Sequence, residues 1–153
     1  MDTHDRKYLG GYGLGSYYIY KHIKPGCDPL GPDNILGFTP GLFNGSGIPF
    51  GGRYMVCGKS PLTGKGKRTN GEYSNGGWGN ANSGGSFGPA IKKAGFDAIF
   101  FTGKSETPVY LLITPDKISI EDAVSAATWK CYKLGGVIMI GSVIESSSVK
   151  INL

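Results

Sequence analysis

The chain has 153 residues, of which 39% are hydrophobic and 18% are charged, a balance typical of one folded domain and not of a disordered chain. Glycine is in excess at 27 residues, but no Gly-X-Y period is present, so a collagen-like helix is excluded. The net charge of +5 suits an anionic partner without saying whether that partner is a nucleic acid, a phosphate-bearing cofactor or a protein.

The three cysteines, Cys27, Cys57 and Cys131, lie far apart in the sequence and form no C-x-x-C pair. Their odd number, without a signal-peptide pattern at the N-terminus, predicts free thiols in a reducing compartment. The longest apolar run, residues 135–144, is too short to span a bilayer. We therefore expect a cytoplasmic protein.

The N-terminal part of the chain predicts one short helix and two strands. Residues 1–7 are polar and expected to be disordered, and residues 8–15 are expected to form a glycine-rich loop. Tyr17 and Tyr20 recur at helical spacing and predict a helix over residues 16–23, which ends before a Pro-Gly pair. Two apolar segments predict strands: 35–39 and 51–57.

The rest of the chain predicts further short elements. Residues 64–81 have no apolar periodicity and predict a long exposed loop. A proline near the start and a glycine at the end predict a helix over 88–95. Short segments beyond it predict a strand at 98–102, a hairpin of 108–113 and 117–120, a helix near 121–132, and a final strand pair at 137–140 and 149–151. This mixture predicts an α+β fold: a single domain of short mixed or antiparallel strands in small sheets, with a few short helices.

Two glycine clusters resemble nucleotide-binding motifs, and both fail on spacing. In Gly11-x-Gly13-x-Gly15 the third glycine comes one residue too early for a dinucleotide fingerprint, and no strand precedes it. Neither Gly58 nor Gly64 has the upstream glycine that a P-loop requires. Both nucleotide motifs are therefore rejected.

The segment 82–88, Asn-Ser-Gly-Gly-Ser-Phe-Gly, is the best candidate for a binding loop. Gly84 and Gly85 remove Cβ atoms where a backbone would approach a ligand, and a predicted helix follows, whose N-terminal amides attract phosphate. Asn82 adds a side-chain amide and a carbonyl. An ordinary tight loop with Ser86 as helix N-cap explains the same pattern, so local sequence leaves both interpretations open.

Arg53 stands at the start of a predicted strand between a glycine and a tyrosine, where its guanidinium could bind an anion with two hydrogen bonds. An ordinary surface arginine explains the same position. No histidine, serine and carboxylate pattern predicts a catalytic triad, and no cysteine spacing predicts an iron–sulfur cluster.

Several short motifs follow one another along the chain: YLGGYGLG at 8–15, DPLGPDN at 28–34, GGRY at 51–54, KSPLTG at 59–64, NSGGSFGP at 82–89, AGFDAI at 94–99 and PVY at 108–110. This ordered series, which runs roughly over residues 8–122, resembles the N-terminal domain of the aldehyde ferredoxin oxidoreductase family.

The resemblance implies a function and a cofactor. Members of this family are cytoplasmic, oxygen-sensitive enzymes of anaerobes that oxidise aldehydes to carboxylic acids and pass electrons through a [4Fe–4S] cluster to ferredoxin. Their tungsten or molybdenum is held by two pyranopterins (tungstopterin or molybdopterin), whose phosphates share a magnesium ion. By resemblance, Arg53 lies between pterin and cluster, the backbone carbonyl of Asn82 binds the magnesium, and Ser83, Gly84 and Gly85 line the same loop.

The chain also departs from the family pattern. Residues 65–79 form an inserted Gly/Lys/Asn loop, and residues 123–153 correspond to a shortened second half that lacks the other magnesium contact. The cluster cysteines and proton-handling residues of the family have no counterparts in the sequence. We therefore expect either a truncated gene product or one piece of a split enzyme, with the [4Fe–4S] cluster supplied by missing domains or a partner chain.

Three functions compete at this stage. The first is a pterin-cofactor-binding domain of an aldehyde-oxidising enzyme, inactive alone, whose partners are ferredoxin and the remaining domains or subunit, with a homodimer as a further option. The second is a non-catalytic remnant or binding module that keeps the fold without turnover. The third, a nucleic-acid binder, lacks any motif of interleaved basic and aromatic residues. We expect binding neither to nucleic acid nor to a membrane.

Overall fold

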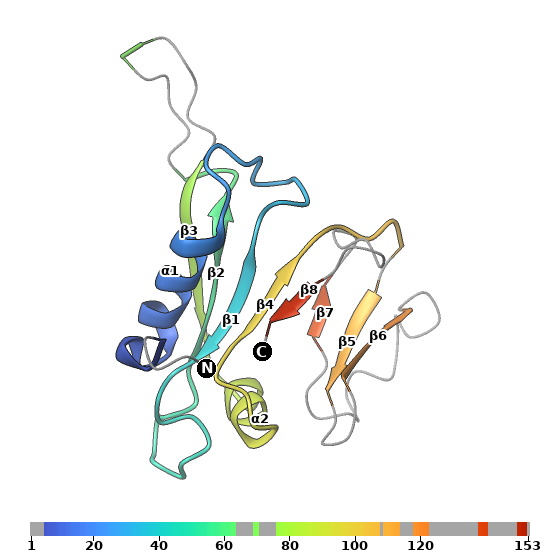
Figure 1. Ribbon diagram of the computed structural model, residues 1–153. Coiled ribbons are helices and arrows are strands. Elements are labelled where there is room, and N and C mark those ends of the chain that lie inside the picture. Colours follow the sequence, from blue (N-terminus) through green and yellow to red (C-terminus); the bar gives the residue numbers. More distant parts are fainter. Residues whose placement is uncertain are drawn as a thin grey trace.

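The protein folds into two antiparallel sheets with helices packed on the larger one, as seen in a computed structural model (Figure 1). The structure describes residues 5–63, 69–70, 76–107, 109–113, 118–122, 138–140 and 150–152. This arrangement confirms the α+β class and the small antiparallel sheets that the sequence predicted.

The helices are short, and so are the strands. A 3-10 turn, η1 (Asp5–Tyr8), precedes the helix α1 (Gly11–His22), and a second helix, α2 (Phe87–Lys93), follows later. The strands are β1 (Leu36–Pro40), β2 (Tyr54–Ser60), β3 (Gly77–Ser83), β4 (Ile99–Thr102), β5 (Val109–Ile113), β6 (Ile118–Asp122), β7 (Ile138–Ile140) and β8 (Lys150–Asn152).

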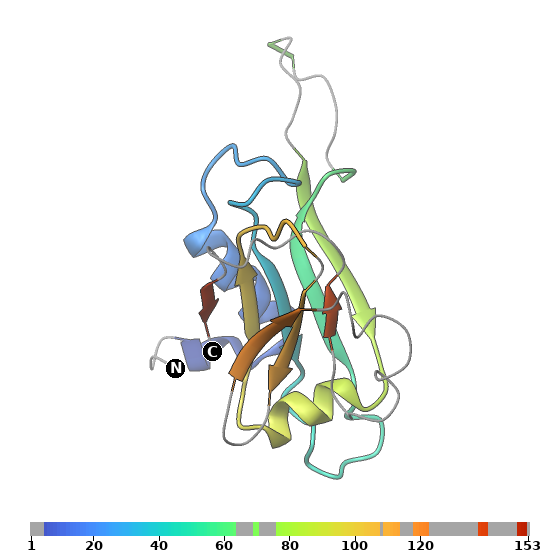
Figure 2. The same ribbon diagram turned by 90° about the vertical axis from the view of Figure 1, so that its right-hand side faces the viewer.

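The larger sheet has the strand order β3-β2-β1-β4-β8, and the smaller has the order β6-β5-β7. Because β1, β2 and β3 are antiparallel neighbours, the end of β1, the start of β2 and the end of β3 meet at one end of the sheet. Figures 1 and 2 both show the loop 41–53 and α2 at this end. We call it the Arg53 end, and the opposite end, where β1 begins and β2 finishes, the Asn34 end.

The larger sheet buries apolar side chains on both faces, because successive side chains along each strand point to opposite faces. On one face, Phe38 packs with α2 and the smaller sheet in a cluster of Phe38, Ile91, Ile99, Phe101, Val109 and Leu111. On the other face, α1 covers a second cluster of Leu14, Ile19, Ile35, Cys57, Ala98 and Phe100. Burial on both faces fixes the register of β1, since a one-residue slip would exchange the two sets.

Helix α1 begins five residues earlier than the sequence predicted, so the expected loop over residues 8–15 is mostly helical. Glycine is unfavourable in helices, but close packing requires it here. A Cβ at Gly15 would lie 2.6 Å from Cys57 Sγ, and one at Gly13 would lie 2.5 Å from the Tyr8 carbonyl oxygen. Leu14, Gly15 and Ile19 are the buried side of the helix, whereas Tyr20 is exposed.

Strand β3 corrects a second prediction, because its first residues were expected to belong to a long loop over 64–81. Residues 77–83 are rich in glycine and asparagine and have no strand-like composition. They form a strand because β2 pairs with them along seven residues, from Tyr54↔Ser83 to Ser60↔Gly77. The inserted loop predicted over 65–79 otherwise lies outside the described residues, apart from 69–70 and 76.

The C-terminal part contains the predicted hairpin, since β5 and β6 pair as antiparallel strands. The two last predicted strands also exist, but they do not pair with each other: β7 joins β5, and β8 joins β4. Of the helix predicted near 121–132, residues 121–122 belong to β6, and the rest lies outside the described residues.

The N-terminus was expected to be disordered over residues 1–7. Residues 1–4 lie outside the described residues, whereas Asp5–Tyr8 forms η1. No helix in the described part of the chain is long and apolar enough to cross a bilayer.

Candidate functional site

All the predicted site residues lie at the Arg53 end of the larger sheet. Arg53 directly precedes β2, Asn82 and Ser83 end β3, and Gly84 and Gly85 form the turn into α2. The register pairs Tyr54 with Ser83 and Met55 with Asn82. The fold therefore brings together two groups of residues that are about thirty positions apart in the sequence.

Arg53 and Asn82 contact each other directly. Arg53 Nη1 donates a hydrogen bond to Asn82 Oδ1, and Asn82 Nδ2 donates to Met55 Sδ at 3.5 Å. Both Arg53 and Asn82 are exposed, so this contact lies at the surface. The sequence predicted that both residues reach one ligand but did not predict this pair, because its geometry depends on β3.

Gly84 is a glycine that neither packing nor backbone conformation explains. A Cβ built on it meets no atom of the described residues within 4 Å, and its φ lies outside the left-handed range. Gly85 has equally open surroundings, but its φ of 92° favours glycine by itself. The open space above Gly84 therefore suits close approach of the backbone by a molecule other than this chain.

Ser86 occupies the N-cap position of α2, as predicted, but its side chain makes no capping hydrogen bond. Its backbone lies in the helical region with φ −86°, whereas a capping serine normally has an extended conformation. The capping hydrogen bond expected of Ser86 is therefore absent, whereas the tight loop before the helix and the N-cap position of Ser86 agree with the interpretation as an ordinary turn.

The N-terminus of α1 also lies at the Arg53 end. A Cβ at Gly10 would lie 2.6 Å from the Pro40 carbonyl oxygen, so the helix starts in close contact with the end of β1. Tyr12 Oη donates a hydrogen bond of 3.3 Å to Asn80 Oδ1 of β3. The first amides of a helix carry partial positive charge. Sequence analysis missed this contribution because it placed residues 8–15 in a loop.

Of the five predicted site residues, Ser83 is half-buried and the other four are exposed. A hollow of about 220 Å³ lies elsewhere, at the Asn34 end, and none of the predicted site residues lines it. Within the described ranges, no three His, Cys, Asp or Glu side chains gather in a group that could bind a metal.

The two described cysteines are free and buried. Burial raises the pKa of the Cys57 thiol to about 11 from the ordinary value of 9.0, and hydrogen bonds from its surroundings offset this only in part. Cys57 Sγ donates to the Gly37 carbonyl oxygen at 3.6 Å. This thiol therefore stays protonated at neutral pH and is part of the core.

Comparison with known proteins decides the family. A sequence model described as "Aldehyde ferredoxin oxidoreductase, N-terminal domain" matches residues 1–140. The chain belongs to the aldehyde ferredoxin oxidoreductase family. The resemblance noted in the sequence is confirmed, and the site described above lies in this N-terminal domain.

Curated relatives of this family member include the tungsten-containing aldehyde ferredoxin oxidoreductases of Thermococcus kodakarensis and Pyrococcus furiosus. They are 46% and 44% identical to it over 118 residues, which is 77% of this chain and 18% of each relative. The WOR-like subunit of aliphatic sulfonate oxidoreductase from Pyrococcus furiosus is 32% identical over 143 residues, or 92% of this chain and 20% of that subunit. The chain thus spans about a fifth of the length of these relatives.

A solved structure has the same fold. It is the active site complex BamBC of benzoyl coenzyme A reductase in complex with 1,5-dienoyl-CoA, which superposes with a TM-score of 0.70 at 33% identity. The match covers 82% of this chain and 18% of that one. The aldehyde ferredoxin oxidoreductase N-terminal fold is therefore present in this short chain.

Proposed function

We propose that this chain is a pterin-cofactor-binding domain of a tungsten or molybdenum oxidoreductase that oxidises aldehydes to carboxylic acids, with ferredoxin as electron acceptor. One observation carries the proposal: Arg53 and the segment from Asn82 to Gly85 converge on one exposed surface. The tungsten-containing relatives support the metal. The unexplained glycine at position 84 supports a ligand there.

The residues present fit a cofactor that bears phosphate. Arg53 supplies a permanent positive charge with a planar set of donors, and its contact with Asn82 orients the guanidinium. The partial positive charge at the start of α1 adds attraction for an anion on the same side of the sheet. Gly84 leaves its main chain accessible, so the cofactor can approach the backbone.

Each residue has a defined task in this proposal. Arg53 would bind the anionic part of the cofactor, and the main chain from Ser83 to Gly85 would contact its phosphate. The carbonyl oxygen of Asn82 would bind magnesium, a cation that prefers oxygen ligands. When bound, the tungsten or molybdenum with its dithiolenes supplies the two-electron redox chemistry, and the protein supplies orientation and charge. The [4Fe–4S] cluster, the proton-handling groups and the surface for ferredoxin would come from further domains or from a partner chain in the cytoplasm.

The experiment uses Gly84, because its substitution separates binding from folding. The chain is purified anaerobically from its own organism with bound partners retained, and tungsten, molybdenum and pterin are quantified. In Gly84→Val and Arg53→Ala we expect about tenfold less metal and pterin per chain, since each change acts on a cofactor contact. Gly84→Ala should leave the melting temperature of the cofactor-free chain unchanged, because its Cβ meets no atom of the described residues.

Two outcomes would contradict the proposal in different ways. Unchanged metal and pterin content in all these variants would overturn the residue assignments. No tungsten, molybdenum or pterin in the wild-type complex would overturn the cofactor-binding function, and it would favour the non-catalytic remnant or binding module.

A further inference from the structure

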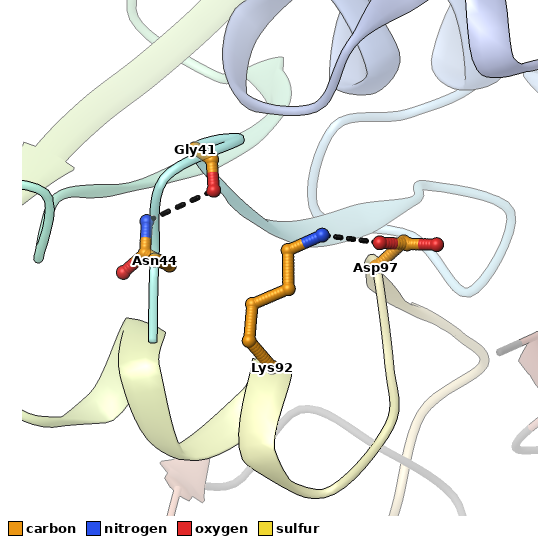
Figure 3. A network of polar contacts seen from close by, with 4 residues as sticks. All are labelled: Gly41, Asn44, Lys92 and Asp97. Atoms are coloured by element: carbon orange, nitrogen blue, oxygen red, sulfur yellow. Dashed lines mark hydrogen bonds and ion pairs between the residues drawn. The ribbon is translucent and has the colours of Figure 1, made fainter. Parts of the chain in front are cut away.

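Asn44, in the loop between β1 and β2, is a buried polar residue that belongs to none of the sites described above. It is only 5% exposed. Its Nδ2 donates hydrogen bonds to the carbonyl oxygens of Gly41, at 3.2 Å, and Arg53, at 2.6 Å. Figure 3 shows the first of these contacts. One side-chain amide therefore joins the two ends of the loop 41–53.

The main chain of Arg53 is thus fixed twice by the same loop. Its carbonyl oxygen accepts one hydrogen bond from Asn44 Nδ2 and another from the Gly41 N–H at 3.2 Å. Among uncharged side chains, only asparagine and glutamine place two donors on one nitrogen, so serine or threonine at position 44 could donate only a single hydrogen bond. The residue type at position 44 therefore matters for the Arg53 backbone.

The other side of Asn44 contacts helix α2. A Cβ built on the buried Gly88 would overlap with Asn44 Oδ1 and lie 3.2 Å from its Cγ. The next residue, Gly45, lies against the same helix, since its Cβ would be 3.6 Å from the Pro89 carbonyl oxygen. Asn44 Oδ1 accepts no hydrogen bond from the described residues. This side of the amide thus makes a packing contact with α2, the helix that follows Gly84 and Gly85.

From these contacts we infer that Asn44 is a positioning residue, which fixes the Arg53 main chain relative to α2 and to the glycine turn before it. A second contact between the same segments supports this role, because a Cβ at Gly52 would lie 3.1 Å from the Gly85 carbonyl oxygen. Asn44 touches no ligand itself and acts through Arg53. Its consequence for cofactor binding rests on the proposed function, whereas its effect on the Arg53 backbone does not.

The chain offers a matched control at the opposite end of the same strands. Asn34 Nδ2 also bridges two carbonyl oxygens, of Pro29 at 2.7 Å and of Lys59 at 2.9 Å. Substitution of either asparagine by aspartate keeps the shape, removes both donors and places a negative charge against two carbonyl oxygens. The two variants thus cause the same chemical change at different distances from Arg53.

The test has one part without ligand and one with a phosphate probe. Backbone amide resonances of the full ¹⁵N-labelled chain are recorded for wild type, Asn44→Asp, Asn44→Ser and Asn34→Asp, and each is titrated with magnesium pyrophosphate. In Asn44→Asp we expect the Arg53, Gly84 and Gly85 resonances to shift and the probe to bind about tenfold more weakly. Asn44→Ser, with one donor left, should fall in between, and Asn34→Asp should leave both readouts at wild-type values.

Unshifted Arg53 and Gly84 resonances in Asn44→Asp, or equal shifts in Asn34→Asp, would overturn the positioning role. If Asn44→Asp does not fold, Asn44→Ser decides the question by the same resonances. A different result would contradict the proposed function. If the wild type and Arg53→Gln bind magnesium pyrophosphate equally, the phosphate-binding role of Arg53 is wrong. The positioning of the Arg53 backbone by Asn44 is tested independently, by the ligand-free spectra.

Discussion

The two ends of the β1–β2 strand pair are each closed by a buried or half-buried asparagine, and the two asparagines differ in how completely they are bonded. Asn34 uses all its hydrogen-bonding groups: besides donating twice, its Oδ1 accepts from the Ile35 N–H at 2.8 Å and the Lys59 N–H at 3.1 Å. Asn44 donates twice, but its Oδ1 has no donor in the described part of the chain. At the Asn34 end, every polar atom of the asparagine side chain is therefore hydrogen-bonded.

Backbone strain is distributed in the same uneven way. The two non-glycine residues with positive φ among those described, Leu9 at 52° and Phe50 at 65°, both lie at the Arg53 end. Phe50 is fully exposed and gains no burial from this conformation. Strained residues often lie at functional sites, because residues there are selected for more than stability. Both strained residues thus lie at the end of the sheet that holds the candidate site.

The largest expected effect concerns the two asparagines themselves. Asn34→Ala removes four hydrogen bonds to the main chain and should lower the free energy of unfolding by about 3–4 kcal/mol. Asn44→Ala removes two hydrogen bonds together with an unsatisfied oxygen and should cost only about 1–2 kcal/mol. Urea denaturation of both variants measures the difference. Equal losses would contradict the distinction between the two ends.

Cys57 lies in the middle of β2, between the two ends, and predicts a dependence of stability on alkaline pH. Burial raises its pKa to about 11 in the folded protein, whereas the thiol of the unfolded chain ionises near 9.0. Stability from this group is therefore complete below pH 9 and decreases as the pH rises to about 11, by about 2 kcal/mol in total. Urea denaturation between pH 8 and pH 11 should show a smaller decrease of the free energy of unfolding in Cys57→Ala than in the wild type.

Gly88→Ala tests the contact of Asn44 with α2. The added Cβ overlaps with Asn44 Oδ1 and should lower the free energy of unfolding by about 1–2 kcal/mol, although alanine is the better helix former. In the Asn44→Ala background this overlap is gone and only the contact with the Gly52 carbonyl oxygen at 3.3 Å remains, so Gly88→Ala should cost less. A double-mutant cycle measures the coupling, and a cost that is the same in both backgrounds would refute the contact.

Phe50→Gly should have the smallest effect and the opposite sign. Glycine adopts a φ of 65° without steric strain, and the exposed phenyl ring contributes no burial, so we expect stabilisation by about 0.5–1 kcal/mol. Thermal unfolding measures the shift, with Phe43→Gly in the same loop as the control that should not stabilise. A lower melting temperature for Phe50→Gly would show that the ring is bound to something in the folded protein.

Most of the apolar strands could be predicted from the sequence, because their side chains are buried in clusters that require continuous apolar segments. The predictions for β1, β4 and the β5–β6 hairpin agree with the structure to within a residue or two. The start of α1 and the whole of β3 could not be predicted, since glycine and asparagine have low propensity for both structures. Close packing against Cys57 and pairing with β2 override that propensity.

The sequence by itself determined the family, the α+β class and the residues of the candidate site, because ordered motifs and apolar segments are local properties that need no coordinates. Only the tertiary structure decided that Arg53 contacts Asn82, that β7 and β8 join different sheets, and that Asn44 ties the Arg53 backbone to its own loop. These are contacts between distant segments. They depend on which strands are neighbours and on which carbonyl oxygens a single buried amide reaches. Neither can be predicted from a pattern along the chain.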